Sequence, residues 1–263
     1  MDTLARNNVT VSGQPRGRPM VFAHGFGCDQ NMWRYVAPAF EDEYRVVLLD
    51  HVGSGGADPS AYDRVKYSSL DGYADDLLEV ARDLDITGGV LVAHSVSGMI
   101  GALAAAREPE RFTDLVLVSP SPRYLDDDGY VGGFSREDID DLLDSLSSNF
   151  LGWSRAMAPT IMGNAERPEL GEELTNSFCR TDPAMAEQFA RVTFLSDNRG
   201  DLRNVRARCL VLQCSDDPLA PERVGRYVHD QLGDSEFVLM AATGHCPNLS
   251  APAETVAAMK AFL

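Results

Sequence analysis

The sequence predicts a doubly wound α/β fold with a mostly parallel sheet and a helical insertion. Short apolar runs rich in Val and Leu recur along the chain, and helical patterns separate several of them. The runs do not alternate between apolar and polar residues, which is typical of strands buried on both faces of a parallel sheet. Strands that alternate with helices indicate a doubly wound architecture.

Six segments are predicted as strands because apolar residues run through them almost without interruption: Met20–Ala23, Arg45–Leu49, Gly89–Ala93, Asp114–Val118, Arg208–Gln213 and Glu236–Met240. Three segments have helical patterns, with apolar residues at helical spacing or a high alanine content: Leu70–Leu84, Met99–Ala106 and Val256–Leu263. A chain of 263 residues is long enough to form one such core without disulfides or a structural metal.

The alternation of strands and helices stops between Ser121 and Ser196, a span too long for a structureless loop. Within it, Ser135-Arg136-Glu137-Asp138 is a helix-capping signature, and Thr181-Asp182-Pro183 is typical of a helix start. We therefore expect residues 121–196 to form helices that lie over the sheet. Residues 1–120 and 197–263 then form the core.

Charge and cysteine content limit the class of protein. Lys and Arg number 23 against 40 Asp and Glu, which gives a net charge of −17. Such a surface repels phosphate backbones and anionic lipids, so we expect no nucleic-acid and no membrane partner. No export signal or membrane-spanning run is visible. Five cysteines without C-x-x-C spacing indicate a reduced, cytoplasmic chain.

Ser95 lies where a predicted strand runs into a predicted helix, in Leu91-Val92-Ala93-His94-Ser95-Val96-Ser97-Gly98-Met99. A nucleophile elbow needs small side chains two positions before and after the nucleophile, because the turn presses them against neighbouring backbone. Ala93 and Ser97 meet this need, although the segment departs from the G-x-S-x-G form. Ser97 is the alternative nucleophile, but Met99 at its flank is too large. A helix-capping serine is the alternative interpretation of Ser95.

A serine nucleophile needs a base, and the base needs a carboxylate that orients it. Asp216 and Asp217 lie in a turn after the strand Arg208–Gln213, and His245 follows the strand Glu236–Met240. Both places are carboxyl ends of strands, where open α/β sheets have their sites. The chain order of serine, acid and histidine also fits a hydrolase elbow. We expect His245 to be the base, with either aspartate as the acid.

The other histidines have ordinary structural interpretations. His229 falls on a helical pattern and is interpreted as a surface residue, and His51 is interpreted as a loop residue. His24 opens a glycine loop and His94 precedes the elbow, so both are expected to pack or hydrogen-bond locally. None has a better claim than His245 to be the base.

A developing oxyanion needs backbone N–H donors. The residue after the nucleophile, Val96, supplies one at the amino end of a helix. The loop His24-Gly25-Phe26-Gly27 follows the first predicted strand, so we expect the N–H of Phe26 to supply the other. Neither this loop nor Gly53-Ser54-Gly55-Gly56 completes a dinucleotide fingerprint, and no metal-ligand or Walker pattern occurs. We therefore expect no cofactor and no metal.

Several short segments, taken together, are far more specific than the elbow alone: Gly25-Phe26-Gly27-Cys28-Asp29-Gln30, Gly53-Ser54-Gly55, Leu70-Asp71-Gly72-Tyr73, His94-Ser95-Val96-Ser97, Ser121-Pro122-Arg123-Tyr124, Gly132-Gly133-Phe134, Leu195-Ser196-Asp197, Leu212-Gln213-Cys214 and Gly244-His245-Cys246-Pro247. With them the chain resembles the α/β-hydrolase family over nearly its whole length. Within that family it resembles the branch of the bacterial stress regulator RsbQ and the plant karrikin and strigolactone receptors.

The resemblance implies a triad of Ser95, Asp217 and His245, with Asp217 favoured because Pro221 follows it by four residues. It implies that residues 121–196 are a four-helix lid over a mostly apolar pocket, lined by Phe26, Phe134, Trp153, Met157, Phe194 and Leu219. Together with the ordered triad, it predicts a serine hydrolase acting on a small, mostly apolar ester or lactone. The alternative is a ligand-sensing signalling regulator that recruits a protein partner, with slow or incidental hydrolysis, because such proteins share the fold and triad.

Overall fold

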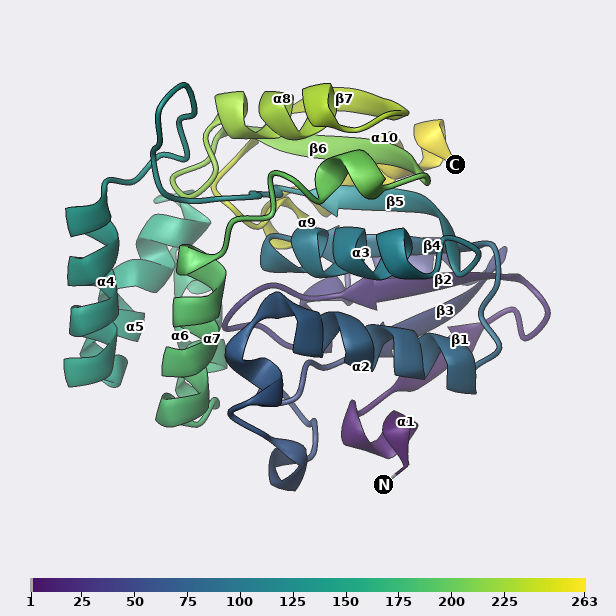
Figure 1. The fold of residues 1–263 in the computed structure, drawn as a ribbon, viewed down its shortest axis with the longest axis horizontal. Coiled ribbons are helices and arrows are strands. Elements are labelled where there is room, and N and C mark those ends of the chain that lie inside the picture. Colours follow the sequence, from purple (N-terminus) through teal and green to yellow (C-terminus); the bar gives the residue numbers. More distant parts are fainter. Residues whose placement is uncertain (1) are drawn as a thin grey trace.

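The computed structural model describes residues 2–263, in which a seven-stranded sheet has helices on both faces (Figure 1). The strand order is β1-β3-β2-β4-β5-β6-β7. β1 pairs with β3 in antiparallel fashion and all the other pairs are parallel. The strands are β1 Thr10–Gly13, β2 Arg18–Ala23, β3 Tyr44–Leu49, β4 Gly89–His94, β5 Phe112–Val118, β6 Arg208–Asp216 and β7 Ser235–Thr243. The predicted α/β fold class is confirmed.

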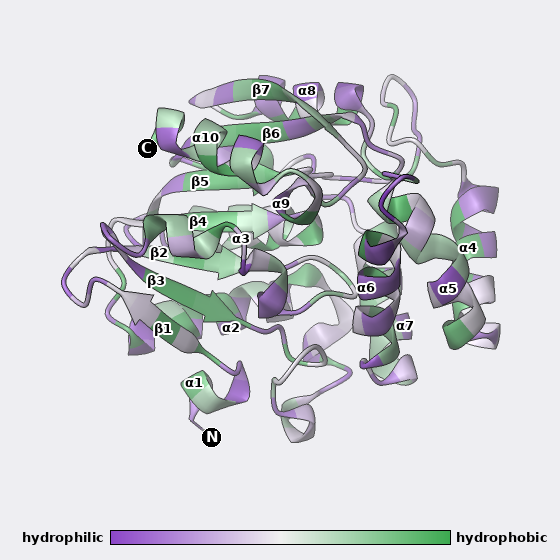
Figure 2. Ribbon diagram, turned by 180° about the vertical axis from the view of Figure 1, so that it is seen from behind, coloured by the Kyte–Doolittle hydropathy of each residue, from purple (hydrophilic) through white to green (hydrophobic). Residues whose placement is uncertain are grey.

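The central strands are buried on both faces because successive side chains enter two separate apolar clusters. On β2, Met20 and Phe22 belong to the cluster behind the sheet as drawn in Figure 1, whereas Val21 and Ala23 belong to the cluster in front. All six residues of β4 are buried. Figure 2 shows the same strands as a hydrophobic band between more polar helices. This two-sided burial explains the unbroken apolar runs in the sequence.

The helices of the core lie on opposite faces of the sheet. α2, α3 and α8 cover the face in front in Figure 1, and α9 and α10 cover the face in front in Figure 2. The bounds are α1 Thr3–Arg6, α2 Leu70–Asp83, α3 Val96–Arg107, α8 Glu222–Gln231, α9 Pro247–Ser250 and α10 Pro252–Phe262. Short 3₁₀ helices occur at Gln30–Trp33, Ala37–Phe40, Pro59–Ala61, Lys66–Ser68 and Leu202–Asn204. Within residues 2–263, no helix has the length and apolar character needed to cross a membrane.

Four helices follow β5 and stand off the carboxyl ends of the strands (Figure 1). They are α4 Arg136–Ser148, α5 Phe150–Met162, α6 Pro168–Cys179 and α7 Pro183–Leu195. Ser135 and Asp138 form the capping box that starts α4, and Asp182 caps α7, as the sequence predicts. The two ends of the segment that carries these helices lie side by side. The Asn198 N–H at one end donates to the Pro122 carbonyl oxygen at the other, at 2.8 Å.

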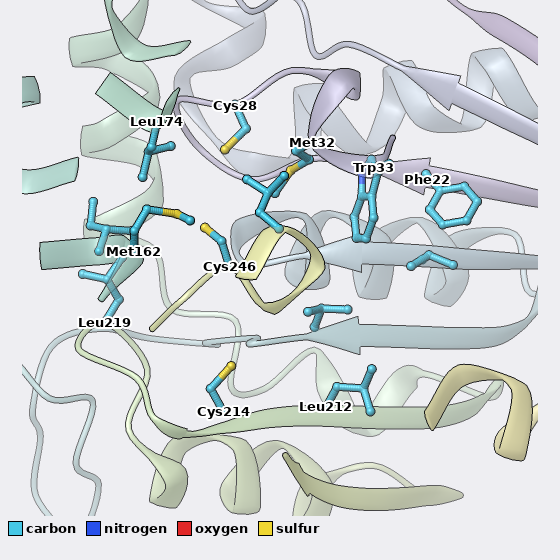
Figure 3. Close-up of a cluster of buried hydrophobic side chains, with 14 of the residues drawn as sticks. Phe22, Cys28, Met32, Trp33, Met162, Leu174, Leu212, Cys214, Leu219 and Cys246 are labelled. Atoms are coloured by element: carbon cyan, nitrogen blue, oxygen red, sulfur yellow. The ribbon is translucent and has the colours of Figure 1, made fainter. Parts of the chain in front are cut away.

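One buried apolar cluster joins the sheet to these four helices (Figure 3). Phe22, Trp33 and Leu212 lie at its sheet end, and Met162 and Leu174 lie at its helical end. Because the cluster is continuous, the helices are held over the strand ends by apolar contacts.

Two parts of the sheet differ from the sequence prediction. β1 was not predicted, because most of its four residues are exposed and it carries no apolar run. β7 was expected to be buried on both faces, and this expectation is wrong. It forms the edge of the sheet beside β6, so several of its side chains are partly open to solvent and Leu239 is 43% exposed.

Candidate active site

Ser95 occupies the tight turn between β4 and α3. Its φ is 56° and its ψ is −124°, a conformation that costs free energy for a residue with a side chain. The turn leaves little room around it. A Cβ atom at Gly25 would lie 2.5 Å from His94 Nδ1 and 3.1 Å from Ser95 Cβ, so the loop after β2 approaches the turn only because glycine stands there.

A hydrogen-bonded chain connects Ser95, His245 and Asp217. Ser95 Oγ lies 2.7 Å from His245 Nε2, and His245 Nδ1 lies 2.8 Å from Asp217 Oδ2. A carboxylate only accepts hydrogen bonds, so Nδ1 carries the proton and Nε2 accepts from the serine hydroxyl. The N–H groups of Leu219 and Ala220 donate to Asp217 Oδ1 at 2.9 and 3.0 Å. All three members are buried. The arrangement suits removal of the serine proton by the histidine.

The alternatives considered for the acid and the nucleophile lie elsewhere. The Asp216 side chain is exposed to solvent at the end of β6. The Ser97 hydroxyl is fully buried, donates to the His24 carbonyl oxygen, and lies 2.7 Å from His51 Nε2. Because the Ser97 hydroxyl proton goes to the His24 carbonyl oxygen, His51 Nε2 carries a proton and donates it to Ser97 Oγ.

His51 lies in a loop after β3, as expected, and it is buried. Its side chain is 1% exposed, and it packs edge-on against the His24 ring with centroids 4.7 Å apart. Burial, reinforced by the neighbouring His24, lowers the pKa of His51 well below its usual value. His51 is therefore neutral and structural. His229, by contrast, lies on α8 with its Nδ1 2.7 Å from Ser235 Oγ.

The two backbone N–H groups expected to hold an oxyanion are those of Val96 and Phe26. Val96 is the first residue of α3, where N–H groups have no helical acceptor. Among residues 2–263, neither N–H has a hydrogen-bond acceptor. Both donors therefore have no partner in this part of the chain, and the amino end of α3 favours negative charge beside Ser95.

Ser95 and His245 line an enclosed cavity between the strand ends and helices α4–α7. Five of the residues expected in the pocket line it: Phe26, Trp153, Met157, Phe194 and Leu219. The ring of Phe26 packs against three other aromatic rings of the lining, with centroids 6.2 Å from Trp153, 5.4 Å from Phe178 and 6.3 Å from Phe194. In the described chain, no Lys, Arg, Asp or Glu side chain lines this cavity. Its surface is therefore mostly apolar and uncharged.

The cavity is narrow. It offers about 20 Å³ to the centre of a water-sized sphere, room for one or two water molecules. Phe134, also expected in the pocket, instead lines an outer groove between α4 and α5. Leu142, Trp153 and Met157 line both the groove and the cavity, so these three side chains separate the two spaces.

Sequence reasoning missed Tyr124 at this site. Its hydroxyl lies 3.4 Å from Ser95 Oγ, and its side chain is 2% exposed. Burial raises the pKa of Tyr124 to about 12, so it is a neutral phenol that can donate a hydrogen bond. Tyr124 follows β5, the neighbour of β4, and its position after a strand end was the signal that could have identified it.

His94 also takes part in the site. Its Nε2 lies 2.8 Å from the carbonyl oxygen of His245 and must donate, because a carbonyl only accepts. Burial, reinforced by the nearby His245, lowers the pKa of His94 to about 3. The sequence indicated local packing for this residue, whereas it contacts a segment 151 positions away in the chain.

Comparison with known proteins gives concordant matches. The sequence model of the Alpha/beta hydrolase family matches residues 20–258. The chain is 38% identical to a probable esterase of Oryza sativa subsp. japonica, over 94% of this chain and 91% of that protein. It is 37% identical to "Karrikin insensitive 2 receptor CA" of Petunia hybrida over the same shares. The solved structure of a hydrolase from Oleispira antarctica has a TM-score of 0.96 at 37% identity, covering 99% of this chain and 96% of that one.

Proposed function

The chain belongs to the alpha/beta hydrolase family, as the resemblance predicted, and we propose that it is a serine hydrolase of small, mostly apolar esters or lactones. The observation that carries this proposal is the 2.7 Å contact between Ser95 Oγ and His245 Nε2 inside an apolar cavity. Related proteins named as esterases support the same reaction class.

In the acylation step, Ser95 Oγ attacks the carbonyl carbon of the ester while His245 Nε2 takes the hydroxyl proton. Asp217 holds the histidine in the tautomer that can accept this proton and stabilises the imidazolium. The carbonyl oxygen becomes negative and accepts from the N–H groups of Val96 and Phe26, each worth about 10²- to 10³-fold in rate. His245 then gives the proton to the departing alcohol, which leaves an acyl group on Ser95.

Water completes the reaction. It gives a proton to His245 Nε2 and attacks the acyl carbon, and the proton returns to Ser95 Oγ as the acid leaves. For a lactone the alcohol and the acid are the two ends of one opened ring. The uncharged lining favours neutral substrates, because an ion would lose its hydration there without gaining a partner.

Residues 121–196 act as the lid in this proposal. The cavity has room for only one or two water molecules, so an ester enters only after the aromatic wall of the cavity moves. Leu142, Trp153 and Met157 separate the cavity from the groove between α4 and α5, and displacement of these side chains opens a route into it.

The test is turnover of p-nitrophenyl acetate, combined with labelling by a fluorophosphonate. Wild type should turn over and carry the label on Ser95. Ser95→Ala should lose both, whereas Ser97→Ala should keep the label, since Ser97 lies in the core beside His24 and His51. Undiminished turnover by Ser95→Ala would refute the proposal.

A second candidate function is ligand sensing with a protein partner, and relatives named as karrikin insensitive 2 receptors favour it. In this role a small ligand changes the lid surface and hydrolysis is slow. The five cysteines, none of them paired within residues 2–263, support a reducing cytoplasmic location for either role.

Covalent occupation of the cavity separates the two functions. The fluorophosphonate-labelled protein and the unlabelled protein serve as baits in lysate of cells that express the chain. A protein retained by only one of the two forms would support sensing. Equal retention by both forms, together with fast turnover of one ester, would contradict it.

A further inference from the structure

Two buried hydrogen-bond donors in the wall of the cavity have no acceptor. They are the Thr193 hydroxyl on α7 and the Trp153 indole N–H on α5, and both residues line the cavity that holds Ser95 and His245. Thr193 is 1% exposed and Trp153 is 4% exposed. Within residues 2–263, neither donor has a partner within hydrogen-bonding distance. Buried donors almost always have an acceptor, so two in one cavity need an explanation.

The Thr193 hydroxyl is unusual for a threonine inside a helix. Such hydroxyls commonly donate to the carbonyl oxygen four residues earlier. Thr255 on α10, which is equally buried, does so to Ala251 at 3.1 Å, and Thr175 on α6 does so to Gly171 at 2.9 Å. Thr193 does not. A valine would have the same shape there without the cost of an unpaired hydroxyl, so the position is better suited to a bound acceptor than to packing.

The other hydrogen-bond donors among the polar side chains of the cavity are already engaged. Ser95 and His245 bind each other, and the Tyr124 hydroxyl lies beside Ser95. His94 donates from Nε2 to the backbone, and its Nδ1 has no partner but carries no proton and can only accept. Thr193 and Trp153 are therefore the donors left for the part of a ligand away from the scissile bond.

We propose that Thr193 and Trp153 form a hydrogen-bond-donating subsite for a second oxygen atom of the substrate, an ether, carbonyl or hydroxyl oxygen separate from the ester group. The inference rests on the proposed hydrolase function and narrows its substrate class. A purely hydrocarbon acyl or alcohol chain leaves both donors unpaired. A neutral ester or lactone with a second acceptor pairs at least one of them, while its remaining atoms contact the apolar wall.

The test compares esters that differ by one atom. p-Nitrophenyl 3-methoxypropanoate is paired with the pentanoate, and the 4-methoxybutanoate with the hexanoate, so that an ether oxygen replaces one methylene in each pair. The measured quantity is the ratio of kcat/KM for the ether ester to that for the alkyl ester. Intrinsic differences in ester reactivity cancel when this ratio is compared between wild type and variants.

Thr193→Val removes the hydroxyl at constant shape, and Trp153→Phe removes the indole N–H. We expect the ratio to fall roughly three- to tenfold in at least one pair, the range of one net hydrogen bond. Thr193→Ser keeps a hydroxyl and should keep the ratio. Thr255→Val is the matched control, because it deletes an equally buried hydroxyl outside the cavity, and it should leave the ratio unchanged.

A fall in either variant supports the subsite and identifies its donor. If the ether-to-alkyl ratio of kcat/KM stays within about twofold of wild type in Thr193→Val and in Trp153→Phe, for both pairs of esters, the proposed subsite is overturned. Unfolding gives an independent readout, since Thr193→Val should raise the thermal midpoint and Thr255→Val should lower it. Failure of the proposed hydrolase function can be told apart from failure of the subsite. If the hydrolase function is wrong, Ser95→Ala still hydrolyses all four esters.

Discussion

The His94 side chain donates from Nε2 to the backbone carbonyl oxygen of His245 at 2.8 Å. His94 is the last residue of β4 and immediately precedes Ser95, so one buried bond ties the nucleophile turn to the loop that carries the proposed base. The low pKa of His94 keeps it neutral over the pH range in which enzymes of this type work. Its tautomer, and with it the direction of this bond, is therefore constant.

Replacement of His94 should reduce hydrolysis although its side chain has no place in the proton transfer. His94→Phe removes the bond to the His245 carbonyl, and we expect kcat to fall about ten- to a hundredfold, the cost of small misplacements of reacting groups. His94→Gln places an amide N–H at nearly the same reach and should recover most of the loss. Steady-state kinetics on p-nitrophenyl acetate measure this. Equal activity of the two variants would show that the bond is unimportant.

The two adjacent aspartates should differ sharply in their effect on rate. Asp217→Asn can stabilise the wrong histidine tautomer, and we expect kcat to fall on the order of 10³- to 10⁴-fold. Asp216→Asn changes an exposed side chain and should leave kcat nearly unchanged. Circular dichroism of both variants checks that the fold is intact. The reverse ranking would mean that Asp216 is the acid.

Acidification should destabilise the fold through the two buried histidines with depressed pKa values. His94 and His51 stay neutral in the folded state, whereas in the unfolded chain they bind protons below about pH 6.5. Unfolding therefore takes up protons between about pH 6.5 and the folded-state pKa values, and the free energy of unfolding falls as the pH falls. Each histidine contributes up to about 1.4 kcal/mol per pH unit.

Urea unfolding at about pH 7 and about pH 5 measures this dependence above the main titration of the carboxyl groups. His94→Gln removes one of the titrating groups and should flatten the dependence by about half, even if it lowers stability at both pH values. An unchanged slope in this variant would show that His94 does not titrate on unfolding.

Only one of the five thiols should react with iodoacetamide in the native protein. Burial raises the pKa of Cys28, Cys209 and Cys214 to about 12, and raises the pKa of Cys246 well above its usual value. These thiols are protonated near neutral pH, and the thiolate is the reactive form. Cys179 is exposed and should be labelled. Figure 3 shows Cys28, Cys214 and Cys246 inside the apolar cluster.

Peptide mass spectrometry identifies the labelled thiols, and unfolding in urea should make all five reactive. Cys28 and Cys246 line the cavity, so they also report on its opening. Rapid labelling of either one in the native state would contradict the prediction and would mean that the cavity opens frequently to solvent.

The parts of the fold that could be predicted are those whose residues are buried locally in a regular pattern. β2 and β4 are apolar along their length because both faces are covered. β1 escaped prediction because its pairing with β3 comes from backbone bonds and needs no apolar side chains. β7 was predicted as a strand but with the wrong exposure, since the sequence does not say which strand lies at the edge of a sheet.

The candidate site divides in the same way. Ser95 and His245 were indicated by their place after strands, where the sheet topology brings side chains together. The conformation of the chain at the end of β6 decides between Asp216 and Asp217. A shift by one residue would exchange the buried aspartate for the exposed one. Phe134 and Thr193 depend on how helices α4–α7 lie over the sheet. No spacing along the chain encodes that packing.

The bond between Asn198 and Pro122 joins the two ends of the segment that carries helices α4–α7. Their segment enters and leaves the sheet at a single seam, which the Arg123–Asp197 ion pair closes on the outside. A change of length within the segment therefore leaves its two ends in place, but the helices are not independent of the triad, because the His245 N–H donates to the carbonyl oxygen of Ile161 on α5 at 2.8 Å. Changes of side chain along α4–α7 can therefore alter which substrates fit, provided that the backbone of α5 stays where it holds His245, so selectivity and chemistry share one helix.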